Sequence, residues 1–299
     1  MDAAQDMFTT AKGGMAVMST KQSFGGAWTI EKLSILSDYL DFYVTALKNQ
    51  PFQLIYIDAF AGTGKIRMGD TNEEIDGSAK LALQAKERFA EYIFIEKNKE
   101  YANELKQMVT DEFPTHKSRV KIVSDDCNTV LLDICNKVDW KKVRAVLFLD
   151  PYAADVKWET LQAIAATGAI DVWYLFPFNA VNRMMKKKGD IDPSWKKKLN
   201  SILGDGSWET EFYKEDPQIS LFDTPGTHSM IRTASTASLK TYIENRLRTV
   251  FSAVSQHSRI LYNSRNSPLF LFCFAVSNKN PTAQRLAMKV ADHILKNDK

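Results

Sequence analysis

Residues 54–64 read Leu54-Ile-Tyr-Ile-Asp58-Ala-Phe-Ala-Gly62-Thr-Gly64, an apolar run that ends in an acid and then breaks into two glycines. An apolar strand that leads into a glycine turn is how an open α/β sheet brings its backbone close to a nucleotide-like ligand. This stretch therefore predicts a ligand-binding strand end, and the rest of the chain can be tested against that interpretation.

Two common nucleotide-binding turns do not match these residues. A P-loop needs a glycine five positions before Gly64 and a serine or threonine after its lysine, and those positions hold Ala59 and Ile66. A dinucleotide fingerprint needs a third glycine where Arg67 stands, at the start of a helix. We expect the next helix only near residues 77–78. The acid-aromatic-glycine spacing favours a site for S-adenosylmethionine (SAM) over a site for NAD.

Short apolar runs alternate with amphipathic segments along most of the chain. The expected strands are 54–58, 92–95, 120–123, 145–149, 170–176, 259–262 and 269–276. The expected helices are one of about twenty residues capped by Thr29, followed by 78–89, 98–110, 128–137, 157–166, 179–187, 235–254 and 282–297. This alternation predicts an α/β fold with a mostly parallel sheet and helices on both faces. Because only a turn-rich connector separates the last two runs, we expect the last strand to return antiparallel, as in the seven-stranded Rossmann-like sheet of class I methyltransferases.

Length and composition are those of an ordinary globular protein. The chain has 299 residues, of which 44% are hydrophobic and 25% are charged. We expect residues 1–23 to form a mobile tail and residues 24–299 to form one methyltransferase-like domain. Residues 189–234 break the strand-helix rhythm with several prolines and glycines, so they predict an insertion of short helices and a loop.

The cysteines and the hydropathy pattern exclude several classes of protein. Cys127, Cys135 and Cys273 are odd in number and widely spaced, so they predict reduced thiols and no metal site. No apolar stretch approaches the ~20 residues needed to cross a bilayer. The N-terminus has no signal-peptide pattern. We therefore expect a cytoplasmic protein with no membrane association.

Acidic residues stand at the ends of four expected strands: Asp58, Glu96, Asp126 and Asp150. Ligands of open α/β sheets bind outside the carboxyl ends of the strands. The Glu96 carboxylate can accept both hydroxyl groups of a ribose. Asp126, or its neighbour Asp125, can accept a hydrogen bond from an adenine amine, or either can simply cap the next helix. The predicted SAM-binding residues are Asp58, Phe60, Ala61, Gly62, Gly64, Glu96, Lys97, Asp126, Cys127 and Asn128.

The segment Val146-Leu-Phe-Leu-Asp150-Pro151-Tyr152 ends a strand in Asp-Pro-aromatic. This ending is found in enzymes that methylate the exocyclic amines of nucleobases. Such an amine is a poor nucleophile because its lone pair is delocalised into the ring. The Asp150 carboxylate and the Pro151 carbonyl can accept its two hydrogens, and stacking of the base on Tyr152 would contribute about 1–3 kcal/mol. We predict Asp150, Pro151 and Tyr152 as catalytic residues; the alternative is an ordinary strand-ending turn.

Basic residues are concentrated in one window, although the net charge of the chain is only +3. Residues 183–198 contain seven lysines or arginines and two aspartates. They follow the fifth expected strand, where a substrate-recognition element would lie. We predict Asn182, Arg183, Lys186, Lys187 and Lys188 as substrate-binding residues that contact nucleic-acid phosphates. The alternative is a solvated helical face.

Several further motifs lie between Phe24 and Lys296. They include Phe24-Gly-Gly-Ala-Trp28-Thr29, Tyr56-Ile-Asp-Ala-Phe-Ala-Gly-Thr-Gly64, Phe94-Ile-Glu-Lys97, Phe148-Leu-Asp-Pro-Tyr152, Val181-Asn-Arg183 and Pro268-Leu-Phe-Leu-Phe-Cys-Phe-Ala-Val-Ser-Asn278. On these motifs the chain resembles the three-Cys-motif partner proteins, a bacterial family called TcmP. The resemblance implies a methyltransferase-like fold and a three-Cys-motif partner protein. The chain departs from the family at Ala153, where glycine is more common.

These observations lead to one main functional hypothesis. The chain is expected to be a SAM-dependent methyltransferase that acts on an exocyclic amine of a nucleic-acid base. RNA is slightly favoured over DNA, because the single proline of Asp150-Pro151-Tyr152 is closer to the Asp-Pro-Phe of transfer-RNA guanine amine methyltransferases. One alternative is a methyltransferase-fold binding or regulatory module that works with a partner protein. Another is methylation of a small molecule.

Overall fold

The computed structural model describes residues 26–68, 73–216 and 230–296. Its centre is an eight-stranded sheet with the order β10-β12-β7-β6-β1-β4-β5, in which β11 also pairs with β12. The strands are β1 (Gln53–Asp58), β4 (Glu91–Ile95), β5 (Val120–Val123), β6 (Val143–Leu149), β7 (Ile170–Phe176), β10 (Ala253–Val254), β11 (Arg259–Tyr262) and β12 (Pro268–Val276). The expected tail, residues 1–23, and residues 217–229 of the expected insertion lie outside the described ranges.

Five neighbouring strands, β5, β4, β1, β6 and β7, run parallel, and β12 runs antiparallel to β7. The apolar runs of β1, β4, β6 and β7 are buried on both faces because helices cover both sides of the sheet, whereas β5 at the edge is only partly buried. In β1, for example, Ile55 and Ile57 face one core and Leu54 and Tyr56 face the other. The predicted α/β fold, with a mostly parallel sheet, helices on both faces and an antiparallel last strand, is confirmed, and the short β10 adds one strand to the seven expected.

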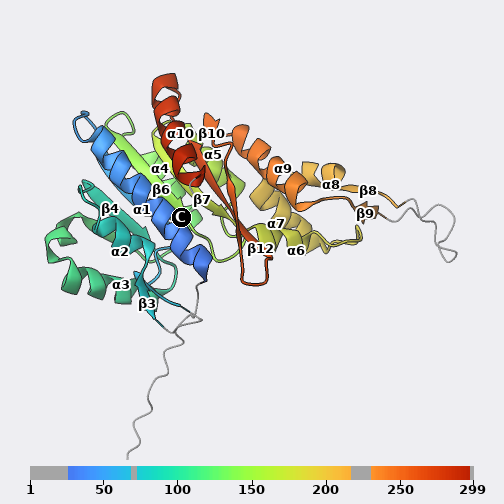
Figure 1. Cartoon of the computed structure of the whole chain (residues 1–299), viewed down its shortest axis with the longest axis horizontal. Helices are drawn as coiled ribbons and strands as arrows, with labels where there is room; N and C mark the ends of the chain where they lie inside the picture. The colour runs from blue at the N-terminus through green and yellow to red at the C-terminus, as the bar shows by residue number, and fades with distance from the viewer. Residues whose placement is uncertain (1–25, 69–72, 217–229, 297–299) are drawn as a thin grey trace, which may run out of the picture.

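The helices form one layer on each face of the sheet (Figure 1). The first layer contains α1 (Ala27–Leu47), α2 (Ser78–Leu83), α3 (Lys99–Glu112) and α10 (Pro281–Lys296). The second contains α4 (Cys127–Lys137), α5 (Trp158–Ala166), α6 (Phe178–Met184), α7 (Pro193–Leu203), α8 (Ser207–Phe212) and α9 (Thr236–Arg248). A short 3-10 helix, η1 (Pro114–Arg119), leads into β5. Trp158 and Trp173 are both buried in the core.

The residues between β7 and α9 extend the molecule beyond the sheet, at the right of Figure 1. They contain α6, α7 and α8 and a two-stranded hairpin of β8 (Tyr213–Glu215) and β9 (Met230–Arg232). A second small hairpin, β2 (Lys65–Arg67) with β3 (Glu74–Asp76), follows β1. Neither hairpin was predicted, because strands of three residues carry too little periodicity to be recognised.

Several helix boundaries differ from the predicted ones, and α6, expected over 179–187, already ends at Met184. Thr29 is not the cap of α1: the helix begins at Ala27 after an extended Gly26, and the Thr29 backbone N–H already donates to the Gly26 carbonyl at 2.9 Å. The helix expected over 78–89 ends at Leu83, because the Lys86 backbone N–H donates to Asp41 of α1 and turns the chain. The helix expected over 235–254 ends at Arg248, because residues 253–254 pair with β12 as β10.

Candidate active site

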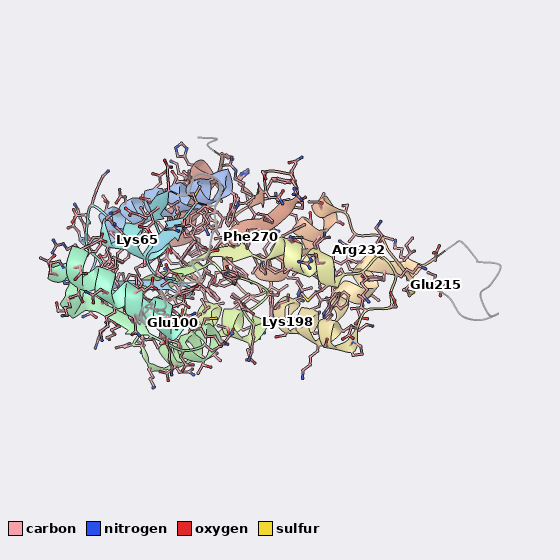
Figure 2. The ribbon with its side chains drawn as sticks, turned by 90° about the horizontal axis from the view of Figure 1, so that it is seen from below. Lys65, Glu100, Lys198, Glu215, Arg232 and Phe270 are labelled. Atoms are coloured by element: carbon pink, nitrogen blue, oxygen red, sulfur yellow. The ribbon has the colours of Figure 1, made fainter. Side chains whose placement is uncertain are left out.

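A cavity of about 630 Å³ lies at the carboxyl edge of the parallel strands. Ligand pockets in proteins have volumes of this order. Residues that follow β1, β4, β5 and β6 line it, together with the first turn of α1 and the start of β12. In Figure 2, Lys65 and Glu100 mark one side of this region, while Phe270 and Lys198 mark the side nearer to α7. The sheet order therefore sets the order of groups along the cavity.

The glycine turn after β1 brings backbone to the cavity wall. Gly62 has φ +59°, and its N–H donates to Glu96 Oε2 at 3.0 Å. A Cβ built on Gly62 meets no described atom within 4 Å, so its backbone faces open space. Gly64 has φ +81°, and a Cβ there would lie 2.5 Å from Met108 Cε. The two glycines therefore serve different purposes, since one faces open space in the cavity and the other permits close packing on α3.

Asp58 is placed behind this turn and not in the cavity wall. Its side chain is completely buried, and Oδ1 accepts the Phe60 backbone N–H at 3.2 Å. Burial raises the pKa of Asp58 to about 7, against the lowering effect of hydrogen bonds from the Ser78 side chain and the Phe60 backbone. The structure thus gives Asp58 the position of a group that holds the turn from beneath, while Phe60, Ala61, Gly62 and Gly64 line the cavity.

Glu96 connects the turn after β1 with the start of α3. Besides the bond from Gly62, its Oε1 accepts the Asn98 backbone N–H at 2.7 Å. Asn98 in turn caps α3 by accepting the N–H groups of Glu100 and Tyr101. Each carboxylate oxygen has two lone pairs, so Glu96 keeps one acceptor site per oxygen for a ligand hydroxyl. The carboxylate is held in place before any ligand arrives.

Asp126 caps α4, which is one of the two roles that the sequence allowed. Its Oδ1 accepts the Asn128 backbone N–H at 3.1 Å, and its Oδ2 lies 3.3 Å from Lys97 Nζ. Burial alone would raise the pKa of Asp126, but hydrogen bonds from Asn128 and Lys97 hold it below its usual value. Asp126 lines the cavity together with Asp125, Lys97 and Cys127. Helix capping and ligand binding are therefore compatible at this residue.

Two neighbours of Asp126 have their side chains engaged within the protein. The Cys127 thiol has a pKa raised to about 12, chiefly by burial, so it stays protonated near neutral pH. The Asn128 side chain is buried and bonds to the Asp155 carbonyl, the Lys157 N–H and the Thr160 hydroxyl. Asn128 thereby fixes the loop after β6, beside the Asp-Pro-Tyr segment.

Asp150, Pro151 and Tyr152 all line the cavity at the end of β6. Asp150 Oδ2 accepts a hydrogen bond from Lys32, whose side chain is buried in the first helix. The same ammonium lies 4.8 Å from the centroid of the Trp28 ring, within cation–π range. Pro151 is buried, whereas Tyr152 is 59% exposed. The carboxylate is therefore anchored from one side and the aromatic ring is accessible.

The predicted substrate-binding residues lie on and after α6 and are not among the described residues that line the cavity. Asn182 is engaged through its side chain and its carbonyl by Arg232 of β9. Arg183, Lys187 and Lys188 have exposed side chains, and Lys186 lies 5.6 Å from the centroid of the exposed Trp195 ring. The structure separates this basic surface from Asp150, with Lys198 of α7 as the basic residue of the window that reaches the cavity.

The sequence did not predict the lining residues that come from α1 and β12, which are Trp28, Thr29, Lys32 and Phe270. The sequence does carry a signal for two of them, Thr29 and Lys32. Thr29 and Lys32 fall at helical spacing on the same stripe as Leu36, Tyr39 and Tyr43, which is the buried face of α1. A lysine on a buried stripe requires a partner, so it points to a charged group nearby.

The donors and acceptors of the cavity suit SAM. Glu96 can accept ribose hydroxyls, Gly62 presents backbone without a side chain, and Asp125 or Asp126 can accept an amine hydrogen. No three His, Cys, Asp or Glu side chains gather as a metal site within residues 26–68, 73–216 and 230–296. Over the same ranges, no helix is both long and apolar enough to cross a membrane.

Comparisons with known proteins were made for the whole chain. No family model matches it, and no curated protein matches it. A solved structure from Legionella pneumophila str. Philadelphia 1, of the family DUF519, is similar with a TM-score of 0.50 at 11% identity, over 90% of this chain and 92% of that chain. Two others have lower TM-scores. They are the methyltransferase domain of bacterial CtHen1 (0.38, 12% identity, 81% of this chain and 98% of that one) and a S-adenosylmethionine-dependent methyltransferase from Clostridium acetobutylicum (0.34, 9% identity, 82% and 92%). At these identities the comparison concerns the fold, which the Legionella protein shares with nearly all of this chain.

Proposed function

We propose that this protein is a SAM-dependent methyltransferase that acts on an exocyclic amine of a nucleic-acid base. The observation that carries the proposal is the single cavity wall formed by the Gly62–Glu96 hydrogen bond and by Asp150-Pro151-Tyr152. Glu96 offers an acceptor for ribose hydroxyls beside the backbone of Gly62, which carries no side chain. Asp150 and Pro151 offer acceptors for an amine beside the exposed ring of Tyr152.

The residues at the end of β6 have the properties that amine methylation requires. When bound, SAM supplies an electrophilic methyl group on a positively charged sulfur. The Asp150 carboxylate and the Pro151 carbonyl would accept the two amine hydrogens and align the nitrogen lone pair, and alignment is a large part of such catalysis. The amine would release one proton on methylation, and Asp150 Oδ1 would accept it. Oδ1 makes no hydrogen bond to the described residues.

The basic window supports a polyanionic substrate. Arg183, Lys187, Lys188 and Lys197 are exposed and make no ion pair with the described residues. Exposed cations beside an exposed aromatic such as Trp195 are typical of surfaces that bind single-stranded nucleic acid. We therefore propose that residues 182–188 and α7 hold the strand that carries the target base. The preference for RNA rests on the likeness of Asp150-Pro151-Tyr152 to the Asp-Pro-Phe segment.

Calorimetric titration of SAM tests the cofactor assignment. We expect micromolar binding by the wild-type protein and a loss of at least ~10-fold in Glu96→Ala, since hydrogen bonds to a charged group contribute about 1.5–3 kcal/mol. Asp133→Ala is the matched control, because it removes an exposed carboxylate of α4 that does not line the cavity. Equal binding by wild type and Glu96→Ala would contradict the assignment.

A tritiated-methyl screen tests the reaction. The wild-type protein should transfer label from SAM to cellular RNA or DNA, and digestion to nucleosides should recover an N-methylated base. Asp150→Ala should abolish transfer while SAM still binds. Label in a small molecule, with none in nucleic acid, would contradict the proposed substrate class.

The ion pair between Lys32 and Asp150 favours a second candidate function. A carboxylate that is neutralised within the protein suits a methyltransferase-fold module that serves a partner protein, as the resemblance to the three-Cys-motif partner family implies. This candidate predicts that Asp150→Ala leaves the biological function intact. The enzyme proposal predicts the opposite result in the same experiment.

A further inference from the structure

The end of the cavity farthest from Glu96 is built by the two ends of the fold. The first turn of α1 contributes Trp28, Thr29 and Lys32, and the start of β12 contributes Phe270. The Trp28 and Phe270 rings lie 5.2 Å apart between centroids at an interplanar angle of 34°. Together they form an aromatic wall beside Asp150, and Figure 2 shows Phe270 on the opposite side of the region from Glu100.

The sheet order separates this aromatic wall from the cofactor end. Glu96 and Asp126 follow β4 and β5, at one edge of the sheet. Asp150 follows β6, and Phe270 precedes Leu271, which pairs with Phe176 at the end of β7. The strands β1, β6 and β7 thus lie between the two ends of the cavity. A ligand that occupies the Glu96 end leaves the aromatic wall available to a second molecule.

Thr29 lines this end of the cavity and has a buried hydroxyl that no described residue satisfies. Its side chain is 1% exposed, and Oγ1 has no hydrogen-bond partner among the described residues. Buried hydroxyl groups are normally satisfied, and a helical threonine has nearby carbonyls that it could use. An unsatisfied, buried hydroxyl in a cavity wall indicates a polar group on the ligand that the cavity accepts.

Lys32 presents a donor next to the acceptor Asp150. The side chain is 4% exposed, and one hydrogen bond goes to Asp150 Oδ2. An ammonium group has three donors, so two remain. A ligand that meets Lys32 and Asp150 together therefore needs an acceptor beside a donor. Adenine and cytosine present this pair, because the exocyclic amine lies next to an unprotonated ring nitrogen. Uracil has no such amine, and the guanine amine lies next to a ring N–H on its pairing edge.

We propose that Trp28, Thr29, Lys32 and Phe270 form the subsite for the acceptor base, and that this subsite selects adenine or cytosine over guanine and uracil. The proposal rests on the proposed function and identifies its substrate class. The aromatic wall and Tyr152 contact the faces of the base. Lys32 donates to the ring nitrogen, Asp150 accepts from the amine, and Thr29 bonds to a further polar atom. Lys32 and Thr29 are thus specificity residues, distinct from the predicted catalytic group.

The test is the binding of AMP, CMP, GMP and UMP to the protein saturated with S-adenosylhomocysteine, measured by saturation-transfer NMR and calorimetry. The saturating ligand keeps AMP out of the cofactor end. We expect AMP or CMP to bind at least ~10-fold more tightly than GMP and UMP, which corresponds to one hydrogen-bonding pair with a charged group. Lys32→Met should remove this preference, and Lys32→Arg should restore part of it.

Two further variants guard against misfolding of Lys32→Met. Thr29→Val keeps the shape of the side chain and should weaken the favoured nucleotide severalfold, and Trp28→Leu should weaken all four nucleotides. Equal binding of the four nucleotides, or unchanged affinity in Thr29→Val and Lys32→Met alike, would overturn the subsite. Loss of S-adenosylhomocysteine binding in Thr29→Val would also overturn it, because the residue would then belong to the cofactor end.

These experiments distinguish failure of the subsite from failure of the proposed function. Selective nucleotide binding without any methyl transfer to nucleic acid would refute the enzyme and leave the subsite standing. Methyl transfer that produces N-methylguanine, with full activity in Lys32→Met, would support the enzyme and refute the subsite. If S-adenosylhomocysteine does not bind, the titration is repeated on Glu96→Ala without it, so that AMP selectivity still decides the question.

Discussion

The last residue of β1, Asp58, is an ionisable group in the protein interior. Asp58 is completely buried and has a pKa raised to about 7, mainly by burial, from an ordinary value of 3.8. The folded protein therefore holds the Asp58 proton more tightly than the unfolded chain does between these two pH values. A group of this kind stabilises the fold at low pH and loses that contribution as the pH rises through its folded pKa.

Replacement of Asp58 by asparagine should change the pH dependence of stability. The side chain keeps an oxygen to accept the Phe60 N–H, so Asp58→Asn should fold. Relative to wild type, the variant should become more stable as the pH rises from 4 to 7, by about 1 kcal/mol per pH unit. Urea unfolding at several pH values measures this. Asp171, which also has a pKa near 7, is present in both proteins and cancels in the difference. Parallel stability curves would contradict the prediction.

The two positive-φ glycines after β1 should differ in their tolerance of a side chain. Gly64→Ala places a Cβ 2.5 Å from Met108 Cε at φ +81°, so we expect a loss of about 2–3 kcal/mol in the free energy of unfolding. Gly62→Ala at φ +59° meets open space and should cost only the backbone strain, about 1 kcal/mol. Urea unfolding compares the two variants. Equal losses would show that packing against α3 does not matter.

At the scale of the element, α1 is the helix that joins the core to the cavity. Its Tyr39, which is fully buried, donates a hydrogen bond at 2.8 Å to the partly buried Asp171 of β7. Nearer the start of the helix, Lys32 bonds to Asp150 at the end of β6. The same face of one helix therefore fixes two neighbouring strands, and a change in how α1 seats on the sheet would move Lys32 relative to Asp150.

Removal of the Tyr39 hydroxyl should destabilise the fold more than removal of the Tyr43 hydroxyl. Tyr39→Phe leaves the partly buried Asp171 carboxyl without its hydrogen-bond donor, so we expect a loss of about 1–3 kcal/mol in the free energy of unfolding. Tyr43→Phe is the matched control, a buried tyrosine on the same helix. Thermal and urea unfolding provide the measurement. A larger loss in Tyr43→Phe would refute the assignment.

The strands and their ends could be predicted from the sequence, because strands buried on both faces read as short apolar runs between acids and glycines. That is why Asp150 and Glu96 could be placed at one sheet edge before the fold was known. The contribution of Lys32 and Phe270 could not be predicted in the same way. They reach the cavity from α1 and β12, and only the strand order brings these elements beside β6. Asp58 shows the opposite limit, since its position at a strand end does not reveal that its side chain turns inward.

At the scale of the whole molecule, one cluster of basic side chains lies outside the cavity. The cavity is lined by carboxylates and by several basic residues, whereas Arg183, Lys187, Lys188 and Lys197, which are exposed and make no ion pair with the described residues, lie on α6, after it and on α7. A polyanion would therefore be held outside the cavity, with Lys198 of α7 between the two regions. This arrangement suits a substrate that offers one base to the cavity and leaves its backbone on the basic surface.

Charge reversal on that basic surface should weaken nucleic-acid binding without changing the affinity for SAM. For Lys187→Glu, Lys188→Glu and Lys197→Glu combined, we expect the salt dependence of single-stranded RNA binding to fall by a slope of about 0.7 for each phosphate that the protein no longer neutralises. The control combines Lys106→Glu, Lys117→Glu and Lys141→Glu, which are exposed residues elsewhere and change the charge equally. Fluorescence anisotropy between low and high salt measures both proteins. Identical slopes would contradict a role for the surface.

The pairing of Trp28 with Phe270 has a consequence for biosynthesis. The two rings are separated by most of the chain, yet they form one wall of the cavity. The residues that form the Glu96 end of the cavity precede β5 or follow it closely, so they are synthesised early. The other end has to wait until β12 has emerged and inserted beside β7. We therefore expect nascent chains that stop before residue 268 to retain, at most, the cofactor half of the site. Selection of the second ligand would begin only when synthesis is nearly complete.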